Sequence, residues 1–127
     1  MAGRVVHFEI PYDDGDRARD FYAKTFGWQL MTMPDMGYTL VTSGPTGDQG
    51  PGEPGFINGG MMARQGPFTA PNIVIDVDNI EEALKAVDEA GGSTVVERQA
   101  VGDMGFSAYF KDTEGNLVGL WETARPA

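Results

Sequence analysis

The stretch that decides the fold is Val5–Gly27, VVHFEIPYDDGDRARDFYAKTFG. Its first residues alternate as in a strand, with His7 and Glu9 on one side and apolar residues on the other. An acidic turn follows, then an apolar stripe at helical spacing, and Gly27 stands where a glycine commonly closes a helix. The stretch therefore predicts a strand followed by an amphipathic helix of about 11 residues.

The same pattern recurs 65 residues further along the chain, where His7 falls on Asn72 and the apolar positions of a second helix fall on those of the first. Each half is typical of a strand, a helix and three further strands. Neither half can bury its sheet alone. We therefore predict a single α+β domain over residues 1–127, in which two βαβββ modules, about 4–64 and 71–123, pack together.

A long segment between the modules has an unusual composition. Residues 44–60 hold seven glycines and three prolines. That density predicts a loop without regular structure. A loop of this length in a compact domain is commonly functional, so we interpret it either as a lid over a binding site or as a disordered excursion.

Length and charge restrict the kind of partner. The chain has 127 residues, a net charge of −10 and no cysteine. An acidic surface disfavours nucleic acid and anionic membranes, no apolar run approaches a membrane span, and the first residues do not resemble a signal peptide. We expect a cytoplasmic protein. The acidic field favours a cationic ligand, and solubility alone is the simpler explanation of the charge.

Several features together resemble the vicinal oxygen chelate superfamily: the two modules, the early HFEIP strand, the DFYAKTFGW helix end and the final DTEGNLVGLWE hairpin. This superfamily includes glyoxalase I, bleomycin- and fosfomycin-resistance proteins and extradiol dioxygenases. The resemblance covers about residues 4–123. It implies a curved, half-barrel mixed sheet with the helices on its convex side, a small-molecule pocket on its concave face, and a homodimer.

Metal-dependent members of that superfamily place one ligand on the first and one on the fourth strand of each module, usually His or Gln, Glu, His and Glu. By resemblance these positions fall on His7, Gly60, Asn72 and Gly119, so one of the four is retained. A transition metal needs three or four ligand atoms, and glycine offers no side chain. We therefore expect no metal or other cofactor, and a divalent metal held by His7 and Glu9 is the disfavoured alternative.

The candidate catalytic residues are His7 and Glu9. A histidine titrates near neutral pH and can act as a base, and a neighbouring carboxylate can orient it or raise its pKa. The alternative for His7 is a buried histidine hydrogen-bonded to Glu9 or Asn72. The alternative for Glu9, taken separately, is an ordinary surface acid. Asn72 itself can bind a ligand through its amide, or cap the backbone after Pro71.

Large apolar residues of the predicted strands can line the pocket, and core packing is the alternative for all of them. Gly60 and Gly119 either leave room in the pocket or mark sheet curvature. The candidate lining residues are Met61, Met62, Phe106, Tyr109 and Trp121.

The sequence thus predicts a glyoxalase/bleomycin-resistance-like protein that binds a small organic molecule, cationic if the charge is informative, without a metal. The alternative is a lyase- or isomerase-type enzyme of the same superfamily that uses His7 and Glu9, with or without a divalent metal. A third hypothesis is an accessory domain whose pocket no longer binds a ligand.

Overall fold

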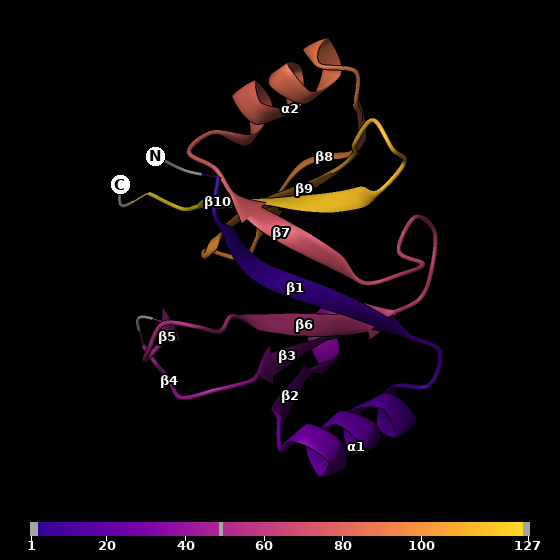
Figure 1. Cartoon of the computed structure of the whole chain (residues 1–127), viewed down its shortest axis with the longest axis vertical. Coiled ribbons are helices and arrows are strands. Elements are labelled where there is room, and N and C mark those ends of the chain that lie inside the picture. The colour runs from indigo at the N-terminus through magenta and orange to yellow at the C-terminus, as the bar shows by residue number, and fades with distance from the viewer. Residues whose placement is uncertain (1–2, 49, 126–127) are drawn as a thin grey trace. The chain divides into compact units, whose positions relative to one another are not determined.

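The computed structural model describes residues 3–48 and 50–125. The chain divides into two compact units: module 1 is His7–Pro71, and module 2 is residues 72–125 together with residues 3–6. Each contains one α-helix and four main strands (Figure 1). The predicted α+β class and its two βαβββ modules are confirmed. Within the described residues, no helix is long and apolar enough to cross a membrane.

Module 1 is a mixed sheet with strand order β2-β3-β6-β1, in which β1 and β6 are parallel and the other pairs antiparallel. A short 3-10 helix, Pro34–Met36, joins β2 to β3. The main elements are β1 (Val5–Tyr12), α1 (Gly15–Phe26), β2 (Gln29–Met33), β3 (Tyr38–Thr42) and β6 (Asn58–Ala63).

Module 2 repeats this arrangement with strand order β8-β9-β10-β7, in which only β10 and β7 are parallel. Just before β1, the Gly3 amide donates to the Asp76 carbonyl at 2.6 Å, and the Asp76 amide donates to the Arg4 carbonyl at 2.8 Å. The main elements are β7 (Asn72–Asp76), α2 (Ile80–Glu89), β8 (Ser93–Val101), β9 (Gly105–Lys111) and β10 (Leu117–Thr123).

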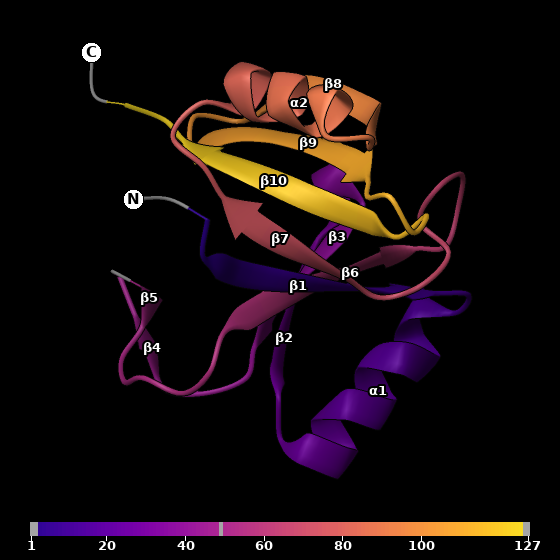
Figure 2. The same ribbon diagram turned by 45° about the horizontal axis from the view of Figure 1, so that its top comes forward.

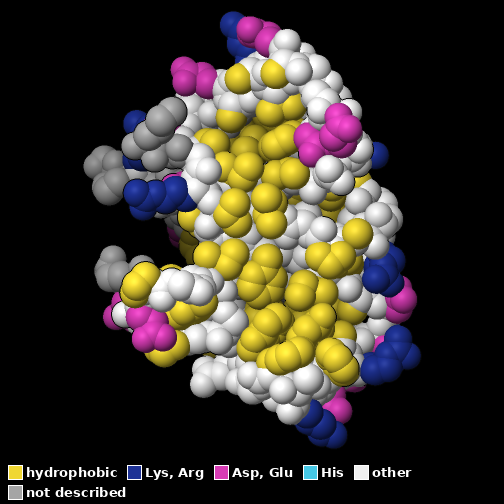
Figure 3. Space-filling view, viewed as in Figure 1, with side chains coloured by type: hydrophobic (Ala, Val, Ile, Leu, Met, Phe, Trp, Pro, Cys, Tyr) yellow, Lys and Arg dark blue, Asp and Glu magenta, His cyan; other side chains and the backbone are white. Residues whose placement is uncertain are grey.

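Helix α1 begins and ends as its sequence predicts but is poorly covered. The Asp14 side chain accepts from the Arg17 amide at 3.1 Å, and Gly27 closes the helix with φ of 72°. No residue of α1 is buried, and Phe21 and Phe26 are 55% and 62% exposed. Apolar side chains are exposed in the lower half of the face in Figure 3, where Figure 1 draws α1 and β6, and also in its upper half.

Helix α2 covers one face of the sheet of module 2, lying over β8 and β9 (Figure 2). Its cap is Asn79, whose side chain accepts from the Glu82 amide at 3.0 Å. The apolar stripe of the helix meets alternate residues of the strands. The buried cluster that results consists of Ile80, Leu84, Ala108 and Leu120.

The prediction that residues 44–60 lack regular structure is wrong. Thr46–Gly47 (β4) and Gly50–Pro51 (β5) pair antiparallel as a small ribbon. The Asn58 side chain fastens the segment, because its Oδ1 accepts from the Ser43 amide and its Nδ2 donates to Thr46 Oγ1, both at 2.9 Å. Glycine density therefore marks tight turns around a short hairpin.

Candidate functional site

Strand pairing in module 1 collects five residues on one face of its sheet. Alternation along β1 places His7 and Glu9 on the same side. Glu9 pairs with Gly60 of the parallel strand β6, and Met62 lies two residues beyond Gly60. Tyr38 of β3 pairs with Met62, so its side chain joins this face. The opposite face, which holds the fully buried Met61, packs toward the core.

A hydrogen-bond network joins three of these side chains. The Tyr38 hydroxyl donates to Glu9 Oε2 at 2.9 Å and lies 2.8 Å from His7 Nε2. The two rings are nearly parallel, with 16° between their planes. Glu9 is only 5% exposed, and His7 is partly buried. A shared hydroxyl therefore links the predicted pair of His7 and Glu9, and their individual roles stay predictions.

Gly60 makes room for the tyrosine. A Cβ atom built on Gly60 overlaps the hydroxyl and the ring of Tyr38. Of the two interpretations of Gly60, room in the pocket or sheet curvature, the first is wrong in this structure, because a side chain of the protein itself fills the space. Any larger residue at this position displaces the group that holds His7 and Glu9 together.

Burial determines the protonation of His7. Desolvation lowers the pKa of His7 below its ordinary value of about 6.5, and the nearby Glu9 carboxylate opposes this shift. Since desolvation is the larger effect, the imidazole is neutral at pH 7. A neutral imidazole can accept a hydrogen bond or a proton.

His7, Glu9 and Gly60 do not fit the metal centre that the family resemblance implies. Within the described part of the chain, no group of three or more His, Asp or Glu side chains lies close enough to hold an ion. Tyr38 occupies both His7 Nε2 and the space above Gly60, where a second ligand would project. Two candidate ligands bridged by a phenol fall short of the three or four that a transition metal requires. The expected absence of a metal stays a prediction.

Module 2 presents an equivalent face. Asn72 begins β7, and Val74, two residues later, pairs with Gly119 of β10. A Cβ on Gly119 would lie 3.1 Å from the ring of Tyr109, so a tyrosine again packs against the glycine. Trp121 follows Gly119 on the same side of β10. Strand pairing therefore places Asn72, Tyr109 and Trp121 on one face of the sheet, and their role in binding stays a prediction.

Asn72 is the unusual residue of this face. It is 7% exposed, and neither its Oδ1 nor its Nδ2 has a hydrogen-bond partner among the described residues. A buried amide without partners is unfavourable by about 1–3 kcal/mol. The alternative role of capping the backbone receives no support from its side-chain contacts, because it makes no such bond.

Phe106 lies apart from the other predicted lining residues. It packs against the core beneath α2, and the Arg98 guanidinium carbon lies 3.5 Å from the centroid of its ring. Glu122 completes the arrangement, since its carboxylate accepts from Arg98 at 3.0 Å and from the Ile80 amide at 2.9 Å. Arg98 first, and then the Ile80 amide, lower the pKa of Glu122. This cluster fastens α2 to the sheet and corresponds to the core-packing alternative.

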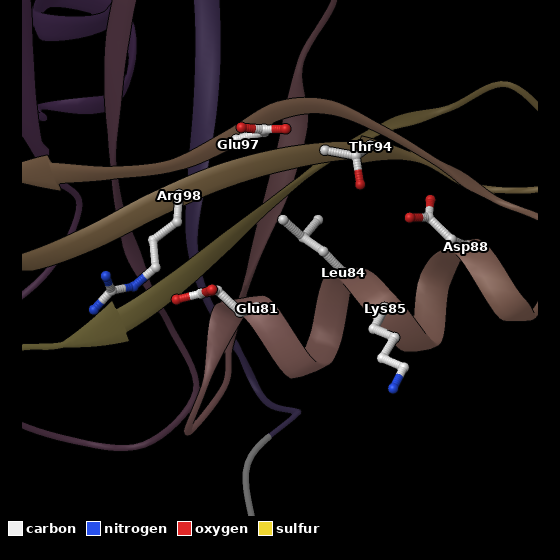
Figure 4. A pocket seen from close by; sticks show the side chains of 7 residues that line it. All are labelled: Glu81, Leu84, Lys85, Asp88, Thr94, Glu97 and Arg98. Atoms are coloured by element: carbon white, nitrogen blue, oxygen red, sulfur yellow. The ribbon is translucent and has the colours of Figure 1, made fainter.

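A shallow pocket on module 2 lies between α2 and β8 (Figure 4). None of the predicted site residues lines it. Its walls are mostly charged, and Glu81 and Arg98 point toward each other across one end. The complete lining is Glu81, Leu84, Lys85, Asp88, Thr94, Glu97 and Arg98.

The sequence interpretation missed Tyr38. Alternation alone cannot place a residue of β3 on the face of His7, because that assignment depends on the register between β3 and β6. The pairing of Leu40 with Gly60 supplies the register. A glycine on the fourth strand was the available signal, since it indicates a close neighbour as readily as an open pocket.

Comparison with known proteins identifies the class. A model of the bleomycin resistance protein-like N-terminal family matches residues 4–44. A glyoxylase-like domain-containing protein of Didymella fabae is 31% identical over 119 residues, covering 91% of both chains. The chain therefore belongs to the glyoxylase-like proteins of the glyoxalase/bleomycin-resistance/dioxygenase, or vicinal oxygen chelate, superfamily, and this resemblance is confirmed.

Two further similarities are more distant. CFP32 of Mycobacterium bovis, described as a candidate glyoxylase, is 29% identical over 126 residues, which are 92% of this chain. The chain spans only 44% of the length of that relative. Methylmalonyl-CoA epimerase from Mycobacterium tuberculosis has the same fold, with a TM-score of 0.64, 18% identity and coverage of 97% and 89% of the two chains.

Proposed function

We propose that this protein binds a small organic molecule without the help of a divalent metal. The observation that supports this most strongly is the buried Asn72 amide, whose donor and acceptor both lack partners among the described residues. Both atoms are inaccessible to solvent, so a ligand has to displace neighbouring side chains to reach them. A ligand with one acceptor and one donor that does so satisfies both atoms and removes an unfavourable contribution of about 1–3 kcal/mol. On the same face, Tyr109 lies level with Val74, two residues from Asn72, and Trp121 lies level with Asp76 further along β7; both supply flat apolar surface.

The test is a thermal-shift screen of cationic aromatic antibiotics and metabolites, repeated with Asn72→Leu. A true ligand raises the melting temperature of the wild type in a saturable manner and fails to do so with the variant. Ile73→Val is the matched control, because Ile73 is the next residue of β7 and is exposed. A hit that stabilises all three proteins equally would contradict a role for Asn72.

An isomerase-type enzyme is the second candidate, and the network of His7, Tyr38 and Glu9 favours it. A neutral imidazole beside a phenol and a carboxylate can remove a proton from a carbon next to a carbonyl and return it. The fold shared with methylmalonyl-CoA epimerase makes that thioester a sensible first substrate. Deuterium incorporation from D₂O into methylmalonyl-CoA, absent with His7→Gln, would support this activity. Equal incorporation by both proteins would contradict it.

The expected homodimer is also a proposal. Its physical support is the incompletely buried apolar surface of α1, including Phe21 and Phe26. Sedimentation equilibrium of the wild type gives the mass directly. A monomer at all concentrations would contradict the proposal.

A further inference from the structure

The number of hydrogens available decides which groups donate and which accept in the network of Tyr38, His7 and Glu9. A phenol has a single hydrogen to donate. The lone pair of His7 Nε2 and the carboxylate of Glu9 compete for the hydrogen of Tyr38, and a carboxylate is the stronger acceptor. The hydroxyl does donate to Glu9 Oε2, at 2.9 Å. Its oxygen is then an acceptor toward His7, so the 2.8 Å contact requires a hydrogen on Nε2.

We infer that Tyr38 is a positioning residue that holds the neutral ring of His7 with its proton on Nε2, so that His7 offers Nδ1 to a ligand as an acceptor. No hydrogen bond reaches Nδ1 from any residue that the structure describes. Part of the His7 side chain is exposed, as a binding group requires. The ligand class is therefore a small molecule that presents an N–H or O–H donor.

The surroundings of His7 favour this class over an anion. The buried Glu9 carboxylate lies two residues away on the same face, and it repels a ligand carboxylate while it attracts an ammonium group. The net charge of −10 acts in the same direction. This part of the inference rests on the proposed function, whereas the position of the proton does not.

The single histidine makes the proton directly observable. In protein labelled with ¹⁵N-histidine, every imidazole signal belongs to His7. At a pH where the ring is neutral, we expect a protonated, pyrrole-like Nε2 and an unprotonated, pyridine-like Nδ1. The Nε2 proton should be visible in water, because its hydrogen bond slows exchange. A proton found on Nδ1 would overturn the inference.

Two variants test whether Tyr38 is responsible. Tyr38→Phe keeps the ring but removes the acceptor, so the Nε2 proton signal should vanish by exchange and both tautomers should appear. Tyr22→Phe is the matched control, since Tyr22 lies in α1, its ring stacks on that of Trp28, and it makes no hydrogen bond to His7. Identical His7 spectra in the two variants would overturn the role of Tyr38.

Glu9→Gln supplies a second measurement in case Tyr38→Phe does not fold. The introduced amide can donate as well as accept, so the hydroxyl can turn toward Nε2 and the Nδ1–H tautomer becomes populated. A spectrum unchanged from the wild type would show that the carboxylate does not set the direction, and would overturn the inference.

The ligand class is tested with three probes of similar size: 2-phenylethylamine, 2-phenylethanol and 3-phenylpropanoate. We expect the amine or the alcohol to move the Nδ1 resonance in a saturable manner, and the carboxylate to leave it unchanged. A shift with the carboxylate alone, or with none of the probes, overturns the assigned ligand class. Because the tautomer is read in the ligand-free protein, failure of the proposed small-molecule binding is distinguishable from failure of the positioning role.

Discussion

Replacement of Gly60 by alanine should destabilise module 1 through Tyr38. The new Cβ overlaps the hydroxyl and ring of Tyr38, so this side chain has to leave its position. Overpacking of this kind costs about 1–3 kcal/mol. The displaced hydroxyl also no longer donates to the buried Glu9 carboxylate, and the loss of a hydrogen bond to a charged group adds about 1.5–3 kcal/mol to the destabilisation. We therefore expect the free energy of unfolding to fall by about 2.5–6 kcal/mol.

A double-mutant cycle in urea isolates this contact. In a Tyr38→Ala background the three atoms nearest to the new Cβ are gone, so Gly60→Ala should lower the free energy of unfolding by much less than in the wild type. In a Tyr38→Phe background it should remain costly, because the ring is retained. Gly47→Ala is the control, since nothing lies within 4 Å of its Cβ position. If Gly60→Ala had the same effect with and without the Tyr38 side chain, the account of this packing would be refuted.

Three other changes follow from the same contacts. The free energy of unfolding should fall as the pH decreases below about 6.5, because burial lowers the pKa of His7 in the folded state and the unfolded chain binds the proton more readily. The melting temperature of the wild type should therefore fall relative to that of His7→Gln as the pH decreases. A difference in melting temperature that does not change with pH would contradict this. Asn72→Leu should leave the ligand-free protein equally stable or stabilise it by about 1–2 kcal/mol, because an unpartnered buried amide is removed; a loss of several kcal/mol in urea would reveal a partner. Glu122→Gln should lower the free energy of unfolding by about 1 kcal/mol, because the contacts of Glu122 with the Ile80 amide and Arg98 become weaker. The pKa of Glu122 is lowered in the folded state, so the stabilisation by its charge is present above pH 4.5 and disappears in acid. A variant as stable as the wild type at pH 7 would contradict this assignment.

The fold could be predicted because the strands and helices of each module have signals in short segments of the sequence. Alternation around His7, the acids before α1 and Gly27 after it all arise within short segments of chain. The repeat then supplied the second module with the same pattern, since both modules place their one parallel pair between the first and fourth strands. Local signals and a repeat are sufficient for architecture.

The site was less predictable because it depends on register. The sequence singled out His7 and Glu9 but gave no reason to join Tyr38 to them, because that residue arrives from β3 through its alignment with β6. For the same reason Gly60 was interpreted as room in the pocket or as sheet curvature, and its packing against Tyr38 was missed. Phe106 was grouped with Tyr109 and Trp121 by residue type, although strand alternation separates it by face from both.

The sequence pattern also did not predict how deeply the apolar faces of α1 and α2 are buried. The stripe on α1 has the spacing of a core-facing helix, yet none of its residues is buried, whereas the corresponding stripe on α2 buries Ile80 and Leu84. Periodicity identifies the face that is apolar. What covers that face depends on the length and placement of the neighbouring strands.

The Tyr38 hydroxyl links His7 and Glu9, and we propose that it keeps the proton of His7 on Nε2. The most direct measurement is a Zn²⁺ titration of ¹⁵N-histidine-labelled protein followed at the His7 resonances. We expect Nε2 to remain protonated and bound to Tyr38, with no stoichiometric change at either ring nitrogen. A saturable loss of the Nε2 proton at one equivalent of Zn²⁺ would contradict it.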